Sequence, residues 1–302
     1  MNRLLKKQPG EEKMTDNQTQ TVNDSWKRIA IFLVITFILG AGAYAGMLLS
    51  DRLFRVFSIV LIFIPAAGAI LTQLITGRSL GELGWGLKNK RYLLWGVLIP
   101  IGIVLAVYIA VWIVMGGFYD HDIAYKAMMI LDLDIDSPFI ALGVYFLFFC
   151  ALYFVWAIIR TLGSELGWQG LLVPALAKRT SFTTTALING IINAVWDLPW
   201  FILFFKSDFL KQEPVWGIVW PTVGAFAFGF VLTWFRLKSE SLWPPVFFRA
   251  AYSVFIWQIL NFITVPKPSM EYVIGLYGCA LPACLVVLAF VLWLKRKSLP
   301  QA

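Results

Sequence analysis

Histidine is nearly absent from this 302-residue sequence: His121 is the one example, and it lies in a loop between two long apolar runs. Charged residues are also scarce, at 14%, while 60% of the residues are hydrophobic. So little charge excludes an ordinary soluble domain and is typical of a chain that crosses a membrane many times. The lack of histidine inside the apolar runs excludes a histidine-based zinc site within the spans of one chain.

Cysteine is scarce as well. The three cysteines, Cys150, Cys279 and Cys284, all lie in apolar segments, and their odd number argues against a disulfide framework. We interpret them as small buried hydrophobic residues. The acidic loop around His121 has the early spacing of an EF-hand, but Ser137 stands where such a loop needs glycine. We therefore favour an acidic, solvated loop over a calcium site.

Long apolar runs dominate the rest of the sequence. A transmembrane helix needs about 20 mostly apolar residues, and eight segments reach that length: about 29–49, 53–75, 93–115, 139–160, 182–205, 214–235, 243–262 and 272–294. These runs do not alternate in hydropathy as the strands of a membrane barrel would. The sequence therefore predicts an all-α, polytopic membrane helix bundle with about eight transmembrane helices.

Basic residues are distributed unevenly between the two sides of this bundle. With the N-terminus in the cytoplasm, 18 Lys and Arg residues fall in cytoplasmic segments and 6 in external ones, as the positive-inside rule requires. The net charge of +8 therefore reports topology and contact with membrane lipids, not a nucleic-acid site. We predict a multi-pass protein of the cell membrane with both termini in the cytoplasm. Residues 1–28 are expected to form a disordered cytoplasmic tail, and residues 29–298 a single transmembrane domain.

Polar residues inside the apolar runs are few and gather in three stretches. Within each stretch they are spaced by one helical turn, so they share a helix face. They are Glu165 and Gln169; Asn189, Asn193 and Asp197; and Arg249 and Ser253. An ionisable residue in an apolar helix costs roughly 2.5–3.5 kcal/mol on insertion scales, so its presence indicates a functional site.

Three motifs carry a family resemblance. The segments SELGWQGLLVPAL, NAVWDLPWF and SLWPPVFFRAAYS, which begin at Ser164, Asn193 and Ser241, resemble the three motifs of the CAAX-protease and bacteriocin-processing (CPBP, or Abi) family. The first family motif reads EExxxR, the second is an aromatic residue followed four positions later by histidine, and the third is HxxxN or HxxxD. The resemblance extends over about residues 80–262, and the residues that surround each motif match closely.

The residues that would carry the chemistry differ from the family motifs at every position but one. Glu165 is the glutamate that remains. The replacements are Ser164 for the first glutamate, Gln169 for the arginine, Asn193 for the aromatic residue, Asp197 and Arg249 for the two histidines, and Ser253 for the final Asn or Asp. The motifs are therefore degenerate. Glu165 and Asp197 are the remaining candidate catalytic residues, in a polar pocket with the other five.

The resemblance implies an intramembrane metalloendopeptidase, in which two glutamates and two histidines bind a metal or polarise a water molecule. Here Arg249 would place a permanent positive charge beside any metal, so we expect no metal and no other cofactor. The favoured prediction is a non-catalytic family member that binds or regulates a membrane partner, such as a membrane protein or a lipidated peptide, for example in bacteriocin immunity. Two alternatives stay open: an endopeptidase with altered chemistry that acts on lipidated or membrane-embedded peptides, and a transporter or small-ligand binder.

Arg249 is also the basis of a structural hypothesis. A buried arginine needs an anion nearby, so we expect an internal ion pair between Arg249 and Glu165, Asp197 or both. One geometric question stays open. The two carboxylates reach the same depth only if the span that ends near residue 160 is long and tilted, or if the next span begins in the cytoplasm.

Overall fold

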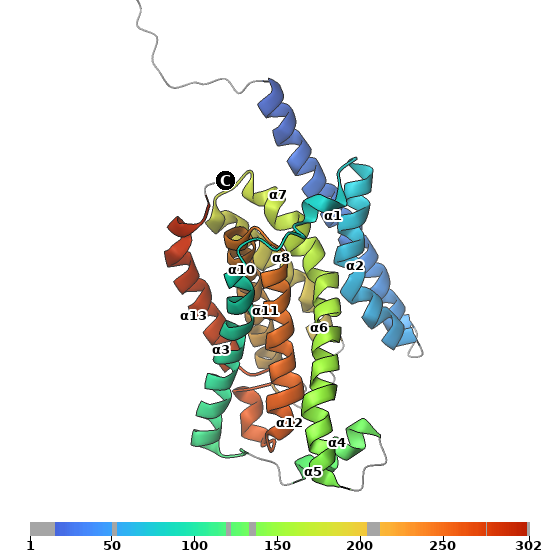
Figure 1. Ribbon diagram of the computed structural model, residues 1–302. Helices are drawn as coiled ribbons and strands as arrows, with labels where there is room; N and C mark the ends of the chain where they lie inside the picture. The colour runs from blue at the N-terminus through green and yellow to red at the C-terminus, as the bar shows by residue number, and fades with distance from the viewer. Residues whose placement is uncertain are drawn as a thin grey trace, which may run out of the picture.

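The computed structural model describes residues 16–49, 53–118, 122–132, 137–203, 212–275 and 277–300, with side chains from residue 24 onward. Almost all of these residues are helical (Figure 1). Within the acidic loop predicted at 116–138, residues 119–121 and 133–136 lie outside the described residues, while Ile123–Leu131 between them forms a short helix rather than an irregular loop. The first 15 residues of the predicted tail also lie outside the described residues.

Seven helices are long and apolar enough to cross a membrane, counted over the described residues. These spans are Asp24–Leu49 within α1 (Asp16–Leu49), α2 (Phe54–Ile75), α3 (Arg91–Met115), Pro138–Ala177, α8 (Phe182–Leu203), α10 (Pro214–Ser239) and Trp243–Ile263. An eighth apolar helix, α13 (Ala280–Leu294), has 15 residues and occupies the place of the last predicted span. The prediction of an all-α membrane bundle with about eight spans is confirmed.

Two of these spans contain several helical segments. Pro138–Ala177 joins α5 (Pro138–Val144), a π-helical turn (Tyr145–Phe149), α6 (Cys150–Glu165), a second π-helical stretch (Leu166–Leu172) and α7 (Val173–Ala177). Trp243–Ile263 joins α11 (Trp243–Val254), a π-helical turn (Phe255–Leu260) and α12 (Asn261–Ile263). Short elements complete the described fold: α4 (Ile123–Leu131) and the 3₁₀ turns Leu80–Leu83, Pro268–Tyr272 and Lys295–Ser298.

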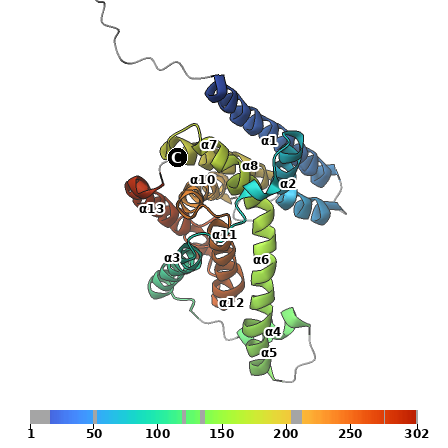
Figure 2. The same ribbon diagram turned by 45° about the horizontal axis from the view of Figure 1, so that its top comes forward.

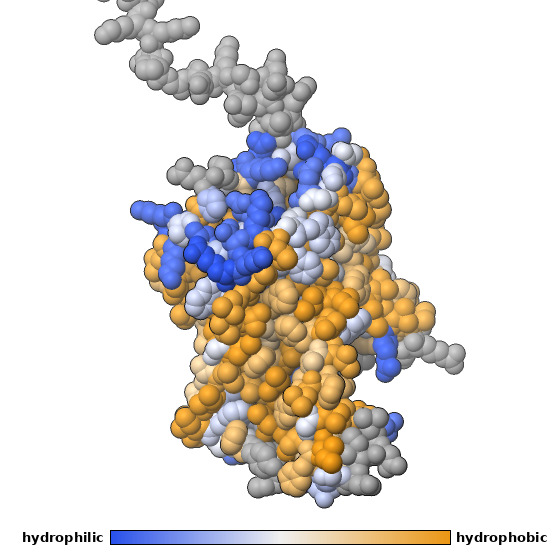
Figure 3. Space-filling model, viewed as in Figure 1, coloured by the Kyte–Doolittle hydropathy of each residue, from blue (hydrophilic) through white to orange (hydrophobic). Residues whose placement is uncertain are grey.

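Both ends of the described chain lie at the same end of the bundle. The start of α1 and the C-terminus lie at the top of Figure 1, and α4 and α5 lie at the opposite end; Figure 2 shows the same arrangement after rotation. On the face in Figure 3, hydrophilic residues gather at the end that carries the termini, and an apolar surface extends below them. This distribution is that of a bundle surrounded by lipid along most of its length.

The first helix begins earlier than the sequence predicted. α1 starts at Asp16, so residues 16–28 of the expected disordered tail are helical. Polar contacts hold this part of α1 against the last turn of α2 and the connection that follows it: Arg28 Nη2 donates to Gln73 Oε1 at 2.6 Å, and Arg78 Nη2 pairs with Asp24 Oδ2 at 2.6 Å. Asp24 and Arg28 are therefore polar residues of a helix with partners on a neighbouring segment, which the sequence pattern alone does not reveal.

The fourth span is also longer than predicted. The sequence suggested an end near residue 160, but the helix extends from Pro138 to Ala177 and has 40 residues. Figure 2 shows this long helix, labelled α6, leaving the group formed by α2 and α8 and reaching α4 and α5. Its later part is buried in an aromatic cluster, where the Trp168 ring contacts Phe32 and Trp196 edge-to-face with centroid distances of 5.5 and 5.6 Å. The polar residues Glu165 and Gln169 of this part are buried as well, although in the sequence they would mark the end of a span.

Helices α8 and α10 pack closely because two glycines meet. A Cβ atom at Gly229 would lie 2.8 Å from the Cα of Gly190 and 2.9 Å from the Asn189 carbonyl oxygen. Small residues allow membrane helices to approach in this way. The close approach brings the polar face of α8 against the α10 backbone.

Candidate functional site

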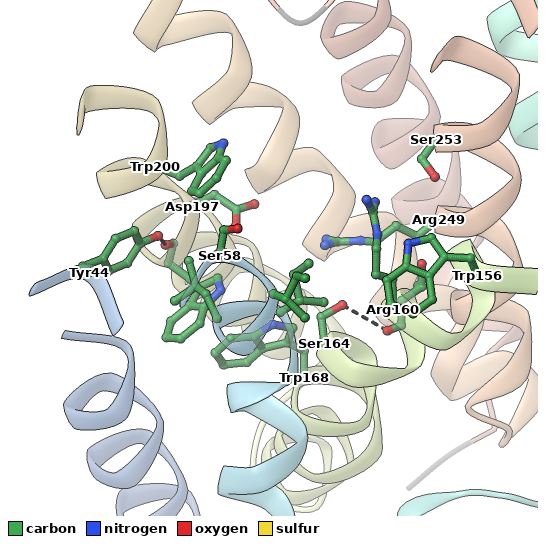
Figure 4. A pocket seen from close by; sticks show the side chains of 15 residues that line it. Tyr44, Ser58, Trp156, Arg160, Ser164, Trp168, Asp197, Trp200, Arg249 and Ser253 are labelled. Carbon is green, nitrogen blue, oxygen red and sulfur yellow. Dashed lines mark hydrogen bonds between the residues drawn. The ribbon is translucent and has the colours of Figure 1, made fainter. Parts of the chain in front are cut away.

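A cavity of about 570 Å³ lies among α1, α2, α6, α8 and α11 (Figure 4). Its walls combine aromatic and aliphatic side chains with a few polar groups. The polar and aromatic lining residues are Tyr44, Ser58, Trp156, Arg160, Thr161, Ser164, Trp168, Trp196, Asp197, Trp200, Arg249 and Ser253. Four of the seven site residues predicted from the motifs therefore face one cavity: Ser164, Asp197, Arg249 and Ser253.

Glu165 lies directly behind this wall and is paired with Arg249. The carboxylate is completely buried, and its Oε1 lies 3.0 Å from Arg249 Nε, while the Arg249 side chain is 24% exposed toward the cavity. The Ser164 hydroxyl donates to the same oxygen at 3.3 Å. Of the partners that the sequence allowed for Arg249, the structure therefore selects Glu165.

The ion pair continues into a buried polar chain that crosses to α10. Arg249 Nη2 donates to Asn193 Oδ1 at 3.3 Å, and Asn193 Nδ2 donates to the Asn189 carbonyl oxygen at 2.9 Å. Asn189 Nδ2 in turn donates to the Gly229 carbonyl oxygen at 2.8 Å and to Thr233 Oγ1 at 3.0 Å. Three helices, α11, α8 and α10, are thereby tied to the helix that carries Glu165. The hydrogen bonds of Arg249, Asn193 and Asn189 therefore hold helices of the bundle together.

Gln169 lies one turn after Glu165 and is also completely buried. The side-chain amide of Gln169 interacts with the Glu165 carboxylate, and apart from that contact the amide atoms and Glu165 Oε2 meet no hydrogen-bond partner among the described residues. The Gln169 carbonyl oxygen, by contrast, accepts a hydrogen bond from Arg236 Nε at 2.7 Å. Buried polar groups without partners are uncommon and mark places where water or a ligand is needed.

Asp197 has a different environment from Glu165. It is half-buried and lines both the large cavity and a second one of about 220 Å³, bounded by α8, α10, α11 and α13. Among the described residues, no ion pair or hydrogen bond to its side chain is present. Arg249 and Ser253 line both cavities as well, and the Ser253 hydroxyl donates to the Ala250 carbonyl oxygen at 3.1 Å. Asp197 is therefore the carboxylate that a ligand in the cavity would meet.

Arg160 is a site residue that the sequence analysis missed. It was assigned to the cytoplasmic end of a span, whereas the 40-residue helix places it on the cavity wall, in register with Trp156 and Ser164. Figure 4 shows the three side chains on the same helix beside the cavity. The spacing Trp156, Arg160, Ser164 at i, i+4 and i+8 was the available signal, since these positions share one helix face.

The metal that the motifs imply does not fit these residues. Within the described part of the chain, no three His, Cys, Asp or Glu side chains gather where they could hold a metal ion. The Arg249 guanidinium lies 3.0 Å from Glu165, and a group that stays protonated cannot share a ligand set with a divalent cation. The described residues therefore do not form the ligand set of a metallopeptidase.

Comparison with known proteins supports the motif assignment. A family model described as type II CAAX prenyl endopeptidase Rce1-like matches residues 135–255, a segment that includes all three motifs. No curated protein matches the chain. The predicted CPBP resemblance is thus confirmed: residues 135–255, which include α6, α8 and α11, match the model of the Rce1-like, CAAX-protease-like family.

Proposed function

We propose that this CAAX-protease-like membrane protein is non-catalytic and uses its intramembrane cavity to bind a membrane partner. The observation that carries the proposal is the 3.0 Å ion pair between Glu165 and Arg249. The ion pair engages Glu165, the one family glutamate that the sequence retains. Its cation, Arg249, stands where the family motif has a histidine.

A peptidase needs a base that reaches a water molecule and an electrophile or metal that polarises the peptide bond. Glu165 is completely buried, and its Oε1 is shared between Arg249 and Ser164. Glu165 is also not among the residues that line the cavity, so this base is not presented to a water molecule there. Asp197 and Arg249 stand at the two histidine positions. They form no metal site with the other described residues, and neither is a neutral proton acceptor that a hydrogen-bond partner orients.

The cavity itself suits binding. Its volume of about 570 Å³ lies in the range of ligand pockets, and its walls are mainly apolar with a few convergent polar groups. A lipidated peptide or an apolar segment of another membrane protein has matching chemistry. Bacteriocin immunity, which the family resemblance suggests, is one process in which such binding would act. We place the protein in the cell membrane with both termini in the cytoplasm, because that topology puts most of its basic residues inside.

A peptidase with altered chemistry is the second candidate, and one observation favours it. Asp197 faces the cavity without an ion-pair partner among the described residues, so it is the carboxylate best placed to act as a base. The small-ligand alternative depends on the same cavity.

The test is an assay that measures binding and cleavage together. Purified full-length protein in liposomes is mixed with a photo-crosslinkable prenylated peptide that carries a fluorophore and a quencher across the expected scissile bond. Wild-type protein should crosslink the peptide at residues of the cavity wall and produce no fluorescence above protein-free liposomes. Glu165→Gln and Asp197→Asn are run beside Arg55→Gln, which alters an exposed arginine outside the cavity. Turnover that is lost in either carboxylate variant and kept in Arg55→Gln would establish the peptidase instead. Absence of any crosslink would contradict the binding role.

A further inference from the structure

Two charges of opposite sign face the large cavity and form no close ion pair with another described side chain; Arg249 attracts Asp197 only from a longer range. Arg160 lies on α6 and Asp197 on α8, and both line the same space. Among the described residues neither side chain takes part in an ion pair or a hydrogen bond. The other two charged groups at this depth, Glu165 and Arg249, are already paired with each other at 3.0 Å.

Arg160 is far from either end of its helix. The helix runs from Pro138 to Ala177, so 22 residues precede Arg160 (160 − 138) and 17 follow it (177 − 160). At about 1.5 Å per residue the guanidinium is attached some 25 Å or more from both ends. A charge at such depth is costly unless it meets a counter-charge or water, and charged residues of this kind mark ligand sites.

The charges of the protein define the ligand. A simple anion would pair with Arg160 and leave Asp197 with only the longer-range attraction of Arg249, while a simple cation would pair with Asp197 and leave Arg160 unpaired. A zwitterion satisfies both groups at once, because its anion pairs with the guanidinium and its cation with the carboxylate. The hydroxyl groups of Ser58 and Ser253 on the cavity wall donate to the carbonyl oxygens of Arg55 and Ala250, so their oxygens can each accept a hydrogen bond from the cation of the ligand.

The walls of the cavity indicate what the zwitterion is attached to. Ile59 and Ile62 of α2 and the indole rings of Trp156, Trp196 and Trp200 surround the polar groups. Indole faces attract ammonium groups, and aliphatic walls suit a hydrocarbon chain. From this combination we infer that the cavity binds the headgroup of a zwitterionic phospholipid, with the phosphate at Arg160, the ammonium at Asp197 and the acyl chains along the apolar wall. The inference depends on Arg160 and Asp197 and not on whether the protein cleaves peptides.

The experiment measures lipid binding to the delipidated full-length protein in detergent, by native mass spectrometry. Phosphatidylethanolamine, phosphatidylcholine and phosphatidylglycerol of identical acyl chains are compared, together with free phosphoethanolamine. We expect both zwitterionic lipids to bind wild-type protein about tenfold or more tightly than phosphatidylglycerol, since the latter leaves Asp197 unpaired. Arg160→Gln should weaken the binding of the zwitterionic lipids by about tenfold to a hundredfold, which is the effect of losing one charge-assisted contact. Arg55→Gln, an exposed arginine on α2, should have no effect.

A second variant separates loss of the ligand contact from loss of the fold. Asp197→Asn should reduce the preference for zwitterionic over anionic lipid while phosphatidylglycerol still binds, which an unfolded protein would not do. Arg160→Lys keeps the charge and should retain part of the affinity. Equal binding of the three lipids to wild-type protein, or unchanged binding to Arg160→Gln, would overturn the inference. Free phosphoethanolamine that binds as tightly as the diacyl lipid would overturn the assignment to a lipid and indicate a soluble zwitterion.

Discussion

The ion pair between Glu165 and Arg249 allows a quantitative prediction for stability. The change is Arg249→Leu, which replaces the guanidinium by an apolar side chain and leaves the completely buried Glu165 carboxylate without a cation. At 3.0 Å and an effective dielectric constant near 20, the attraction between the two charges is about 5–6 kcal/mol. The desolvation of both ions offsets much of this attraction, so the loss expected from breaking one side is about 3–5 kcal/mol.

The double change Arg249→Leu with Glu165→Leu should cost less than the sum of the two single changes, because no charge is then left unpaired. We expect a coupling free energy of about 1.5–3 kcal/mol for this pair. Asp197 supplies the matched control. It lines the same cavity as Arg249 but forms no ion pair within the described residues, so the coupling between Arg249→Leu and Asp197→Leu should be clearly smaller.

The assay is reversible unfolding of the purified protein in detergent, followed by tryptophan fluorescence for the wild type, the three single variants and the two double variants. Two outcomes would refute the reasoning. One is strict additivity of the changes in unfolding free energy for Glu165→Leu and Arg249→Leu, which would mean that the two side chains do not stabilise each other. The other is a larger coupling for Asp197 than for Glu165, which would mean that Arg249 pairs with the other carboxylate in the folded protein.

Three further predictions address packing, metal content and topology. Gly229→Ala should destabilise the protein by about 1–3 kcal/mol, because its new methyl group would lie 2.8 Å from the Gly190 Cα; Gly102→Ala, which has open space around it, should be neutral or slightly stabilising in the same unfolding assay. Elemental analysis after gentle detergent extraction should find no stoichiometric zinc, and about one zinc per chain that disappears in Glu165→Ala would contradict this. A reporter fused to the C-terminus should be active in the cytoplasm and one in the loop 116–138 outside the cell; a C-terminal reporter active only outside would reverse the topology.

Much of the fold follows from apolar run length, because a membrane leaves helices as the main way to satisfy backbone hydrogen bonds. The predicted spans correspond to the observed helices except at three boundaries. The last apolar helix, α13, begins at Ala280 rather than at residue 272. α1 starts at Asp16, and the fourth span extends to Ala177. In both cases polar residues suggested an end to the helix. They are instead held by polar partners, as Arg28 is by Gln73, or line a cavity, as Arg160 does.

The site was predictable as a group of residues but not as a geometry. The motifs placed Ser164, Arg249 and Ser253 at one cavity. The spacing of one helical turn between Arg249 and Ser253 fixed their common face of α11. The partner of Arg249 depended on how far the fourth span continues, which sequence periodicity does not determine. The π-helical stretch Leu166–Leu172, which alters the register of every later side chain, also has no simple sequence signal.

The length of the helix from Pro138 to Ala177 has a consequence for the response of the protein to its membrane. Its 40 residues extend about 60 Å, twice the roughly 30 Å thickness of the hydrocarbon layer. The end near α5 is not a polar stalk, because Phe139 is 79% exposed and Leu147 is 73% exposed. Such a mismatch is relieved by tilting the helix or thickening the surrounding lipid. A thinner or thicker membrane would therefore change the tilt of the same helix that carries Arg160 and Glu165, so that bilayer thickness would act on the shape of the cavity.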